Sequence, residues 1–413
     1  MLTGGNILAD AILIISGGIE SVPGIIRAKE LGLYVVVADG NKNAPGFKYA
    51  DNIIICSTYN ADEMANAAEY FNNTVRRING VLSIASDVPI TVSTVANKLN
   101  LKGHTLSTAM MSADKFLMKE RFIEKNIQCP WFSMVNNLDH LKELVNLKKC
   151  KFVIKPVDSR GSRGVLLIDK ESDLEFSYSH AIDNSPTERV MLEEYLEGPQ
   201  ISTEAILLDD TASCPGFCDR NYEMIEKTKP FIIENGGDQP SFLSVDEQES
   251  IKKITIEAGR ALGVTSGTVK GDIVITPTGP KVIEIATRLS GGWFCTDQIP
   301  LATGVDFVGI AIRIALGVSV DPLETQQRFQ KGTAVRYFFP PPGRLKSIEN
   351  IEEAKHLKGI HKFMMFAKAG DEIGAVSNHT QRAGFVLTLA ETNKEAVAIA
   401  QHAISIVKFE YSD

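Results

Sequence analysis

The first hundred residues alternate between short apolar runs and longer stretches in which apolar residues recur at helical spacing. The apolar runs predict four buried strands, at 11–16, 33–38, 52–56 and 80–85. Between them we expect helices over 22–31, 61–72 and 89–99. Strands separated by helices are typical of a parallel sheet covered on both faces. The sequence therefore predicts a Rossmann-like α/β domain over residues 1–112.

Beyond residue 112 the pattern changes to strands that follow one another with fewer helices between them. After a helix over 114–125, strands are expected at 152–156, 164–168, 190–195 and 201–208, and after a helix over 246–262, at 267–275 and 281–286. Such a pattern indicates an α+β domain over 113–325, with a subdomain over about 127–197. A small α+β domain over 326–413 completes the chain, with its last strand at 384–389 and a helix near 394–407.

Composition and charge narrow the class of protein. Of the 413 residues, 44% are hydrophobic and 23% are charged, as in folded globular proteins. The net charge of −8 argues against nucleic acid or an anionic membrane surface as a partner. The best membrane candidate, 307–318, is too short to span a bilayer. The six scattered cysteines and the lack of a basic, apolar leader indicate a cytoplasmic protein.

A first glycine loop, Ser16 to Ser21, lies between a predicted strand and a predicted helix. Asp39 ends the next strand, 21 residues after Gly18, where a dinucleotide-binding protein has an acid for the ribose. The loop lacks the G-x-G-x-x-G pattern, so we favour a tight turn that binds no cofactor. An NAD-linked oxidoreductase remains an alternative interpretation.

A second glycine loop follows the strand that ends in Lys155 and Pro156. Its residues 157–164 read Val-Asp-Ser-Arg-Gly-Ser-Arg-Gly, between two predicted strands. Glycines allow backbone N–H groups to approach an anion, and a lysine at the strand end adds a positive charge. The loop is not a Walker loop, but it is suited to covering phosphates.

Two acids are predicted to face each other on neighbouring strands. Asp272 and Glu284 are 12 residues apart, and Pro277 and Gly279 between them indicate a hairpin turn. Two carboxylates on one face repel unless a cation lies between them, and hard oxygen ligands favour Mg²⁺. The sequence thus predicts a magnesium site on this hairpin.

Taken together, these segments resemble the ATP-grasp superfamily over essentially the whole chain, and most of all its carboxylate–amine (amino-acid) ligase branch. The N-terminal stretches Asp39-Gly-Asn-Lys-Asn-Ala-Pro-Gly46 and Ser86-Asp87-Val-Pro89 are similar to the family's pre-ATP-grasp domain. The resemblance implies a pre-ATP-grasp domain over 1–112, an ATP-grasp domain over 113–325 with its lid at about 127–197, and a C-terminal domain over 326–413.

The resemblance also implies roles for individual residues. Lys115 and Lys155 match lysines that contact ATP, and the phosphate-covering loop contributes Ser159, Gly161, Ser162 and Gly164. The segment that receives adenine comprises Glu193, Glu194, Tyr195 and Leu196, and Gln200 replaces the glutamate that usually holds the ribose. Asp272 and Glu284 match the ligands of Mg²⁺ or Mn²⁺, with Ala286 where the family often has asparagine. Arg288 and the Ser290–Gly292 turn match the site where the acyl phosphate forms, and Arg382 matches a substrate-contacting arginine.

The activity implied is ATP-dependent and ADP-forming ligation of a small-molecule carboxylate to an amine, through an acyl phosphate. The transition state of phosphoryl transfer places charge on phosphoryl oxygens, which Mg²⁺, lysine and arginine stabilise. The alternatives are a purine-pathway or carboxylase-type enzyme that uses formate or bicarbonate, and a nucleotide-binding module without turnover. If the protein forms an oligomer, we expect a homodimer.

Overall fold

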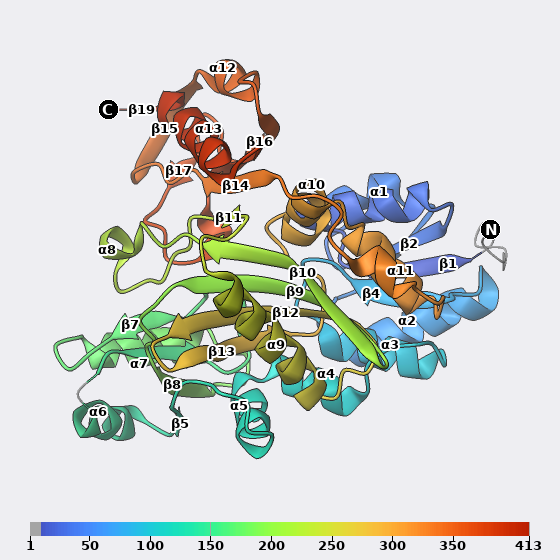
Figure 1. Cartoon of the computed structure of the whole chain (residues 1–413), viewed down its shortest axis with the longest axis horizontal. Coiled ribbons are helices and arrows are strands. Elements are labelled where there is room, and N and C mark those ends of the chain that lie inside the picture. The colour runs from blue at the N-terminus through green and yellow to red at the C-terminus, as the bar shows by residue number, and fades with distance from the viewer. Residues whose placement is uncertain (1–9, 149, 413) are drawn as a thin grey trace.

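The computed structural model describes residues 10–148 and 150–412, which form four β-sheets with helices packed around them. Figure 1 shows the N-terminal part at the right, the green strands of a smaller sheet at the lower left, and the C-terminal part at the top. This mixed α/β architecture is the predicted fold class. Within the described residues, no helix has the length and apolar character that crossing a membrane would need.

The N-terminal sheet is parallel, in the order β3-β2-β1-β4. Its strands are β1 (Ala11–Ile15), β2 (Tyr34–Asp39), β3 (Asn52–Ile55) and β4 (Gly80–Ser83). The helices of this region are α1 (Val22–Glu30), α2 (Ala61–Thr74) and α3 (Pro89–Lys98), followed by α4 (Leu106–Ala113) and α5 (Lys115–Glu124). All five residues of β1 are buried, as expected for a strand covered on both faces. The predicted Rossmann-like unit is confirmed.

A second, antiparallel sheet forms a separate layer with the order β5-β8-β6-β7. It contains β5 (Phe132–Val135), β6 (Phe152–Pro156), β7 (Leu166–Ile168) and β8 (Val190–Glu194), and it packs against α6 (Leu138–Leu147) and α7 (Leu174–Asp183). We refer to it as the lid sheet. The sequence predicted β6 and β8 closely but not β5, whose short run of mixed residues carries little periodicity.

The largest sheet has eight strands in the order β13-β12-β9-β10-β11-β14-β18-β16. They are β9 (Gln200–Leu208), β10 (Thr211–Arg220), β11 (Gly237–Gln239), β12 (Gly267–Thr276), β13 (Gly279–Ala286), β14 (Gly332–Tyr337), β16 (Ile360–Met365) and β18 (Gly384–Ala390). Helix α9 (Val245–Ala261) covers β9, β12 and β13, and α13 (Asn393–Ile406) covers β14 and β18. The sheet therefore runs from the middle of the chain into its C-terminal part.

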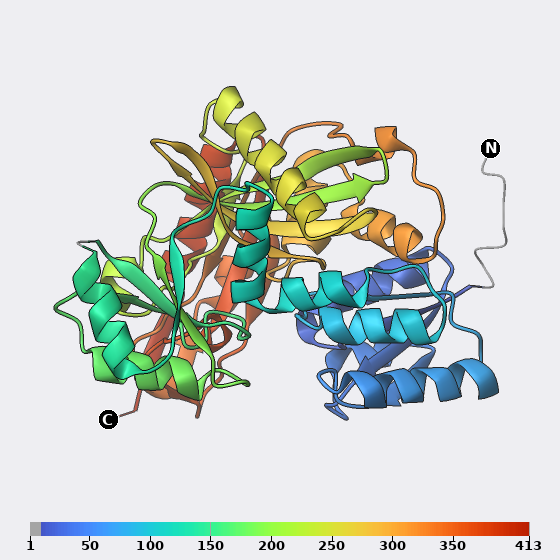
Figure 2. The same ribbon diagram turned by 90° about the horizontal axis from the view of Figure 1, so that it is seen from below.

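The remaining elements connect or flank these sheets. They are α8 (Ile225–Thr228), α10 (Ile299–Thr303), α11 (Phe307–Ala315), α12 (Ile351–Lys355), and a three-stranded sheet of β15 (Gly343–Glu349), β17 (Glu372–Ile373) and β19 (Lys408–Tyr411). The expectation that the strand at 384–389 is the last one is wrong, because β19 follows it and pairs with β15. Figure 2 shows the N-terminal region, in blue, at the lower right and the lid region, in green, at the lower left.

Candidate active site

A cavity of about 610 Å³ lies where the N-terminal region, the lid sheet and the large sheet meet, with a C-terminal segment closing one side. Every residue that the sequence singled out for catalysis, nucleotide or metal lines this cavity, except Gly164. Gly164 has a φ of +72° and packs against Pro156 and Asn184, so it shapes the loop from behind. Segments far apart in the sequence thus converge on one site.

Lys115 lies between the second glycine loop and the predicted metal acids. Helix α5 begins at this residue, and the Asp114 side chain caps the helix by accepting hydrogen bonds from two backbone N–H groups. The ammonium of Lys115 donates to the backbone oxygen of Ser159 at 2.7 Å and lies 3.7 Å from Glu284 Oε1. The Asp114 cap therefore fixes the start of α5, where the nearly buried ammonium of Lys115 lines the cavity.

Lys155 belongs to a buried group of three charges. Its ammonium is 2.5 Å from Glu193 Oε1, and the ammonium of Lys119 is 3.0 Å from Glu193 Oε2. All three side chains are at most 5% exposed. Burial alone would raise the pKa of Glu193, but the two lysines outweigh it and hold that pKa below its usual range. The group carries a net positive charge beside the cavity, which suits a nucleotide phosphate.

The second glycine loop is held by contacts to both ends of the chain. The Arg160 guanidinium stacks over the Tyr59 ring at 4.4 Å, from the N-terminal region. On the other side, the His379 backbone N–H donates to the Gly161 oxygen at 3.1 Å, and Ser162 Oγ lies 3.2 Å from His379 Nε2. The loop therefore covers the middle of the cavity and connects three regions.

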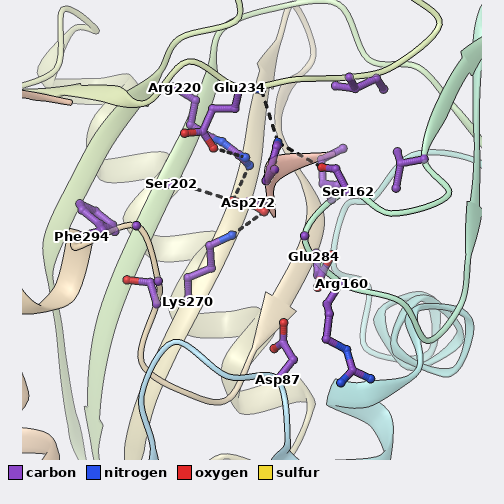
Figure 3. Close-up of a pocket in the computed structure, with 18 of the residues that line it drawn as sticks. Asp87, Arg160, Ser162, Ser202, Arg220, Glu234, Lys270, Asp272, Glu284 and Phe294 are labelled. Atoms are coloured by element: carbon purple, nitrogen blue, oxygen red, sulfur yellow. Dashed lines mark hydrogen bonds and ion pairs between the residues drawn. The ribbon is translucent and has the colours of Figure 1, made fainter. Parts of the chain in front are cut away.

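Asp272 and Glu284 are direct cross-strand partners on β12 and β13, as predicted. Asp272 is held by Lys270 at 2.5 Å and by Arg220 at 2.8 Å, and it accepts a hydrogen bond from Ser202 (Figure 3). These cations overcome the effect of burial and hold the pKa of Asp272 well below its usual range. Asp272 is therefore ionised at neutral pH, and both acids line the cavity.

This pair fits a Mg²⁺ ion that takes further ligands from phosphates. Protein Mg²⁺ sites commonly use one or two carboxylates, with substrate phosphates and water as the other ligands. Among the described residues, no cluster of three His, Cys, Asp or Glu side chains could hold a metal by itself. The two acids supply hard carboxylate oxygens in the expected number. Their role as metal ligands stays a prediction that fits the chemistry of Mg²⁺.

Arg288 and Arg382 both line the cavity, with different partners. Arg288 makes a two-bond ion pair with Asp87, at 2.7 and 2.9 Å, which ties the end of β13 to the N-terminal region. The Arg382 guanidinium stacks on the Tyr337 ring at 3.7 Å and donates to the Glu234 backbone oxygen at 2.6 Å. Arg382 is 12% exposed, so it is not the solvated surface residue that most arginines are.

The Ser290–Gly292 turn contacts the carboxylates of Glu20 and Glu204, and Glu204 is fully buried. The Ser290 N–H donates to Glu204 Oε1 at 2.6 Å, while Glu204 Oε2 and Ser290 Oγ have no hydrogen-bond partner among the described residues. Burial raises the pKa of Glu204 to about 7, although the hydrogen bond from the Ser290 N–H opposes the shift. Glu204 therefore titrates near neutral pH.

We expect this carboxyl to make stability depend on pH. Its ordinary pKa of 4.5 applies in the unfolded chain, so the folded state loses stability as the pH rises from about 4.5 to about 7. The loss from this one group is about 3 kcal/mol, and Glu204→Gln, which keeps an acceptor for the Ser290 N–H, should lack it. Urea unfolding at about pH 5 and pH 8 measures the difference. An unchanged pH dependence in the variant would contradict the assignment.

Comparison with known proteins agrees with this arrangement. Residues 112–292 match the family model described as ATP-grasp domain, and residues 336–412 match the model described as L-amino acid ligase C-terminal domain 2. The chain contains an ATP-grasp domain.

The individual relatives are distant in sequence, but their matches cover most of this chain. Phosphoribosylamine–glycine ligase of Methanocaldococcus jannaschii is 23% identical over 428 residues, 97% of this chain and 94% of that protein. An uncharacterised protein of Sinorhizobium fredii is 23% identical over 81% of this chain and 69% of its own length. The crystal structure of L-amino acid ligase from Bacillus licheniformis superposes with a TM-score of 0.81 at 18% identity, over 98% and 99% of the two chains. That superposition shows a shared fold.

Several residues of the ATP-grasp cavity were missed by sequence reasoning. Lys270 could have been predicted from the sequence. It stands two residues before Asp272, so the two side chains point to the same face of β12. No local pattern marks Arg220 or His379, which reach the cavity from other segments. From the sequence, the loop 231–241, with Glu234, is expected to shape the pocket, and Glu234 lines the cavity. The seven histidines are dispersed along the sequence, which predicts each of them at the surface or in the core rather than in catalysis. His379 instead lines the cavity and contacts the glycine loop.

Proposed function

We propose that this protein is an ADP-forming ligase that uses ATP to join a carboxylate to an amine through an acyl phosphate. The observation that carries the proposal is the shared cavity. It brings Lys115 and the Lys155 group together with two acids, Asp272 and Glu284, that face each other across one hairpin. ATP-grasp relatives with the same fold have been solved with ADP bound, which supports a nucleotide in this cavity.

One part of the cavity suits the nucleotide. The segment Glu193–Leu196 lies at the end of β8 and lines the cavity, and Val153, Val274 and Ile283 contribute apolar walls for a base. Lys155 and Lys115 would contact the phosphates, and the glycine loop would exclude water from them. Gln200, the first residue of β9, also lines the cavity and would hydrogen-bond the ribose.

The acids are proposed to hold Mg²⁺ or Mn²⁺ at the phosphates. When bound, the ion neutralises charge that develops on the transferring phosphoryl oxygens. Lys270 and Arg220 already surround Asp272. These two cations would orient the acid, and Lys115 would stabilise phosphoryl oxygens directly, because its ammonium lies beside both the loop and Glu284.

The other part of the cavity suits the substrates. We propose that Arg288 positions the reacting carboxylate. Asp87 accepts from Nε and Nη2 of its guanidinium, and the Leu289 backbone oxygen accepts from Nη1 at 3.4 Å. The remaining N–H groups of Nη1 and Nη2 would contact the substrate. Arg382, fixed on Tyr337, would hold a second anionic group. The cytoplasmic location and the homodimer stay predictions.

A matrix of substrates tests the function. Purified protein with ATP and Mg²⁺ is mixed with pairs of carboxylates and amines, including formate and bicarbonate. We expect one class of pairs to give ADP, phosphate and an amide in equal amounts, measured by coupled assay and mass spectrometry. AMP and pyrophosphate as products would contradict the proposal. Turnover that needs formate or bicarbonate would instead favour the purine-pathway or carboxylase-type alternative.

A further inference from the structure

The first glycine loop is fixed in the structure by its own hydrogen bonds. The Asp39 carboxylate accepts from the Gly17 N–H at 2.8 Å and from the Asn41 N–H at 2.8 Å. The Gly46 N–H donates to the Gly17 oxygen at 2.7 Å. Asp39 is therefore engaged by the loop itself, which removes the acid that a dinucleotide ribose would need. The loop is instead a rigid support for the residues that follow it.

Glu20, in this loop, extends to the Ser290–Gly292 turn. Its Oε2 accepts a hydrogen bond of 2.9 Å from the N–H of Gly292, in the turn where the acyl phosphate is proposed to form. Glu20 lines the cavity, and the Gly292 N–H is its one hydrogen-bond partner among the described residues. The loop thus delivers a carboxylate from the N-terminal region to the reacting end of the site.

Glu20 differs from the other acids around it. Cavity carboxylates such as Asp87, Glu234 and Asp272 are each in an ion pair with an arginine or a lysine. Among the described residues, no lysine or arginine lies within ion-pair distance of Glu20. Among the described residues that line the cavity, Glu194 is the other carboxylate without an ion pair. It lies on β8, in the part of the cavity proposed to bind the nucleotide. Glu20 is thus a carboxylate without an ion pair, beside the Ser290–Gly292 turn where the acyl phosphate is proposed to form. A cationic or proton-donating ligand would stabilise its charge.

We propose that Glu20 is the general base that binds the ammonium group of the amine substrate and takes its proton. This rests on the proposed function, since the amine is that reaction's nucleophile. An ammonium ion has no lone pair and cannot attack, so a base beside the turn is needed. Burial raises the pKa of the Glu20 carboxyl, against the Gly292 N–H and the more distant Arg382 and Arg288. A raised pKa makes it a better proton acceptor than an ordinary glutamate.

The step balances as follows. The ammonium gives one proton to Glu20, and the nitrogen lone pair attacks the carbonyl carbon of the acyl phosphate. A C–N bond forms, the C–O bond to the phosphoryl group breaks, and phosphate leaves with that electron pair. The nitrogen loses a second proton to the leaving phosphate, and Glu20 releases its proton to solvent. The products are the amide, hydrogen phosphate and one proton.

The test separates the two half-reactions. Acyl phosphate made from ATP and carboxylate is trapped with hydroxylamine, which is uncharged at neutral pH and needs no base, and amide formation with the natural amine is measured in parallel. We expect Glu20→Gln to keep hydroxamate formation within a few fold and to lose about 100-fold or more in amide formation. The amide deficit should shrink as the pH rises, because solution then supplies the unprotonated amine.

Two further variants complete the design. Glu20→Asp keeps the charge but shortens the reach to the Gly292 N–H, so we expect amide formation between those of wild type and Glu20→Gln. Glu30→Gln, which removes an exposed partner of Arg27 at the end of α1, is the matched control and should behave as wild type. Equal losses of hydroxamate and amide in Glu20→Gln, or no loss of amide, would overturn the proposal. Wild-type protein that forms no hydroxamate with any carboxylate would overturn the proposed function as well.

Discussion

Glu284→Gln is expected to lower the rate of ATP turnover by about 100-fold or more, since the loss of one oriented charge contact to a phosphoryl transition state commonly has that effect. The substitution keeps the size of the side chain on β13 and removes the charge that faces Asp272. Lys115, 3.7 Å away, keeps its hydrogen bond to Ser159. The fold should therefore persist while the metal site loses a ligand.

Nucleotide binding separates the metal role from a merely structural one. For wild type, we expect ATP to bind more tightly with Mg²⁺ than with EDTA in calorimetry, and Glu284→Gln should lose most of that difference. Glu120→Gln changes an exposed residue of α5, the helix that begins at Lys115, and should leave both turnover and the Mg²⁺ dependence unchanged. Full activity in Glu284→Gln would remove Glu284 from the metal site.

Glu193→Gln should produce the largest loss of stability. It leaves the ammonium groups of Lys119 and Lys155 buried with no anion between them. Breaking a buried ion pair by removing one partner costs about 3–5 kcal/mol. Burial already lowers the pKa of Lys119, so the deficit should shrink as the pH rises and a lysine without its anion loses its proton. Urea unfolding at several pH values measures both effects.

Two comparisons sharpen this prediction. Glu197→Gln removes an exposed partner of Lys151 at 3.3 Å and should change stability by about 1 kcal/mol or less. Adding Lys119→Met to Glu193→Gln removes one of the two stranded charges, so the double variant should be more stable than Glu193→Gln alone. If Glu193→Gln were no less stable than Glu197→Gln, the buried charges would not act as a unit.

The sequence was informative where local rules determine geometry. Strands and helices of the N-terminal sheet were predicted within about three residues, because apolar periodicity and proline and glycine positions are local signals. The facing of Asp272 and Glu284 was also predicted from their spacing. In the structure that pairing depends on a bulge after Asp272, since the register changes between Asp272 and Ile273. The prediction was correct, yet no sequence signal reveals the bulge.

The remaining part of the site depends on contacts between distant segments. Asp87 pairs with Arg288 across 201 positions, and Glu234 receives Arg382 across 148. Lys119 lies one helical turn after Lys115, and so appears in sequence as an ordinary helix residue. The packing of three regions against one another decides which of these charged residues form pairs. These pairs therefore cannot be predicted from a single sequence.

The continuous eight-stranded sheet limits how this protein can be recombined with its relatives. Strand β11 pairs with β14, and β14 with β18, so the C-terminal segment continues the hydrogen-bonded ladder of the middle region. A fragment that ended before Gly332 would leave β11 as a bare edge, open to pairing with other chains. A chimaera that exchanged the C-terminal segment would have to reproduce strand register as well as sequence. New substrate preferences are therefore more easily built by changing the loops that carry Glu234 and Arg382 than by exchanging whole domains.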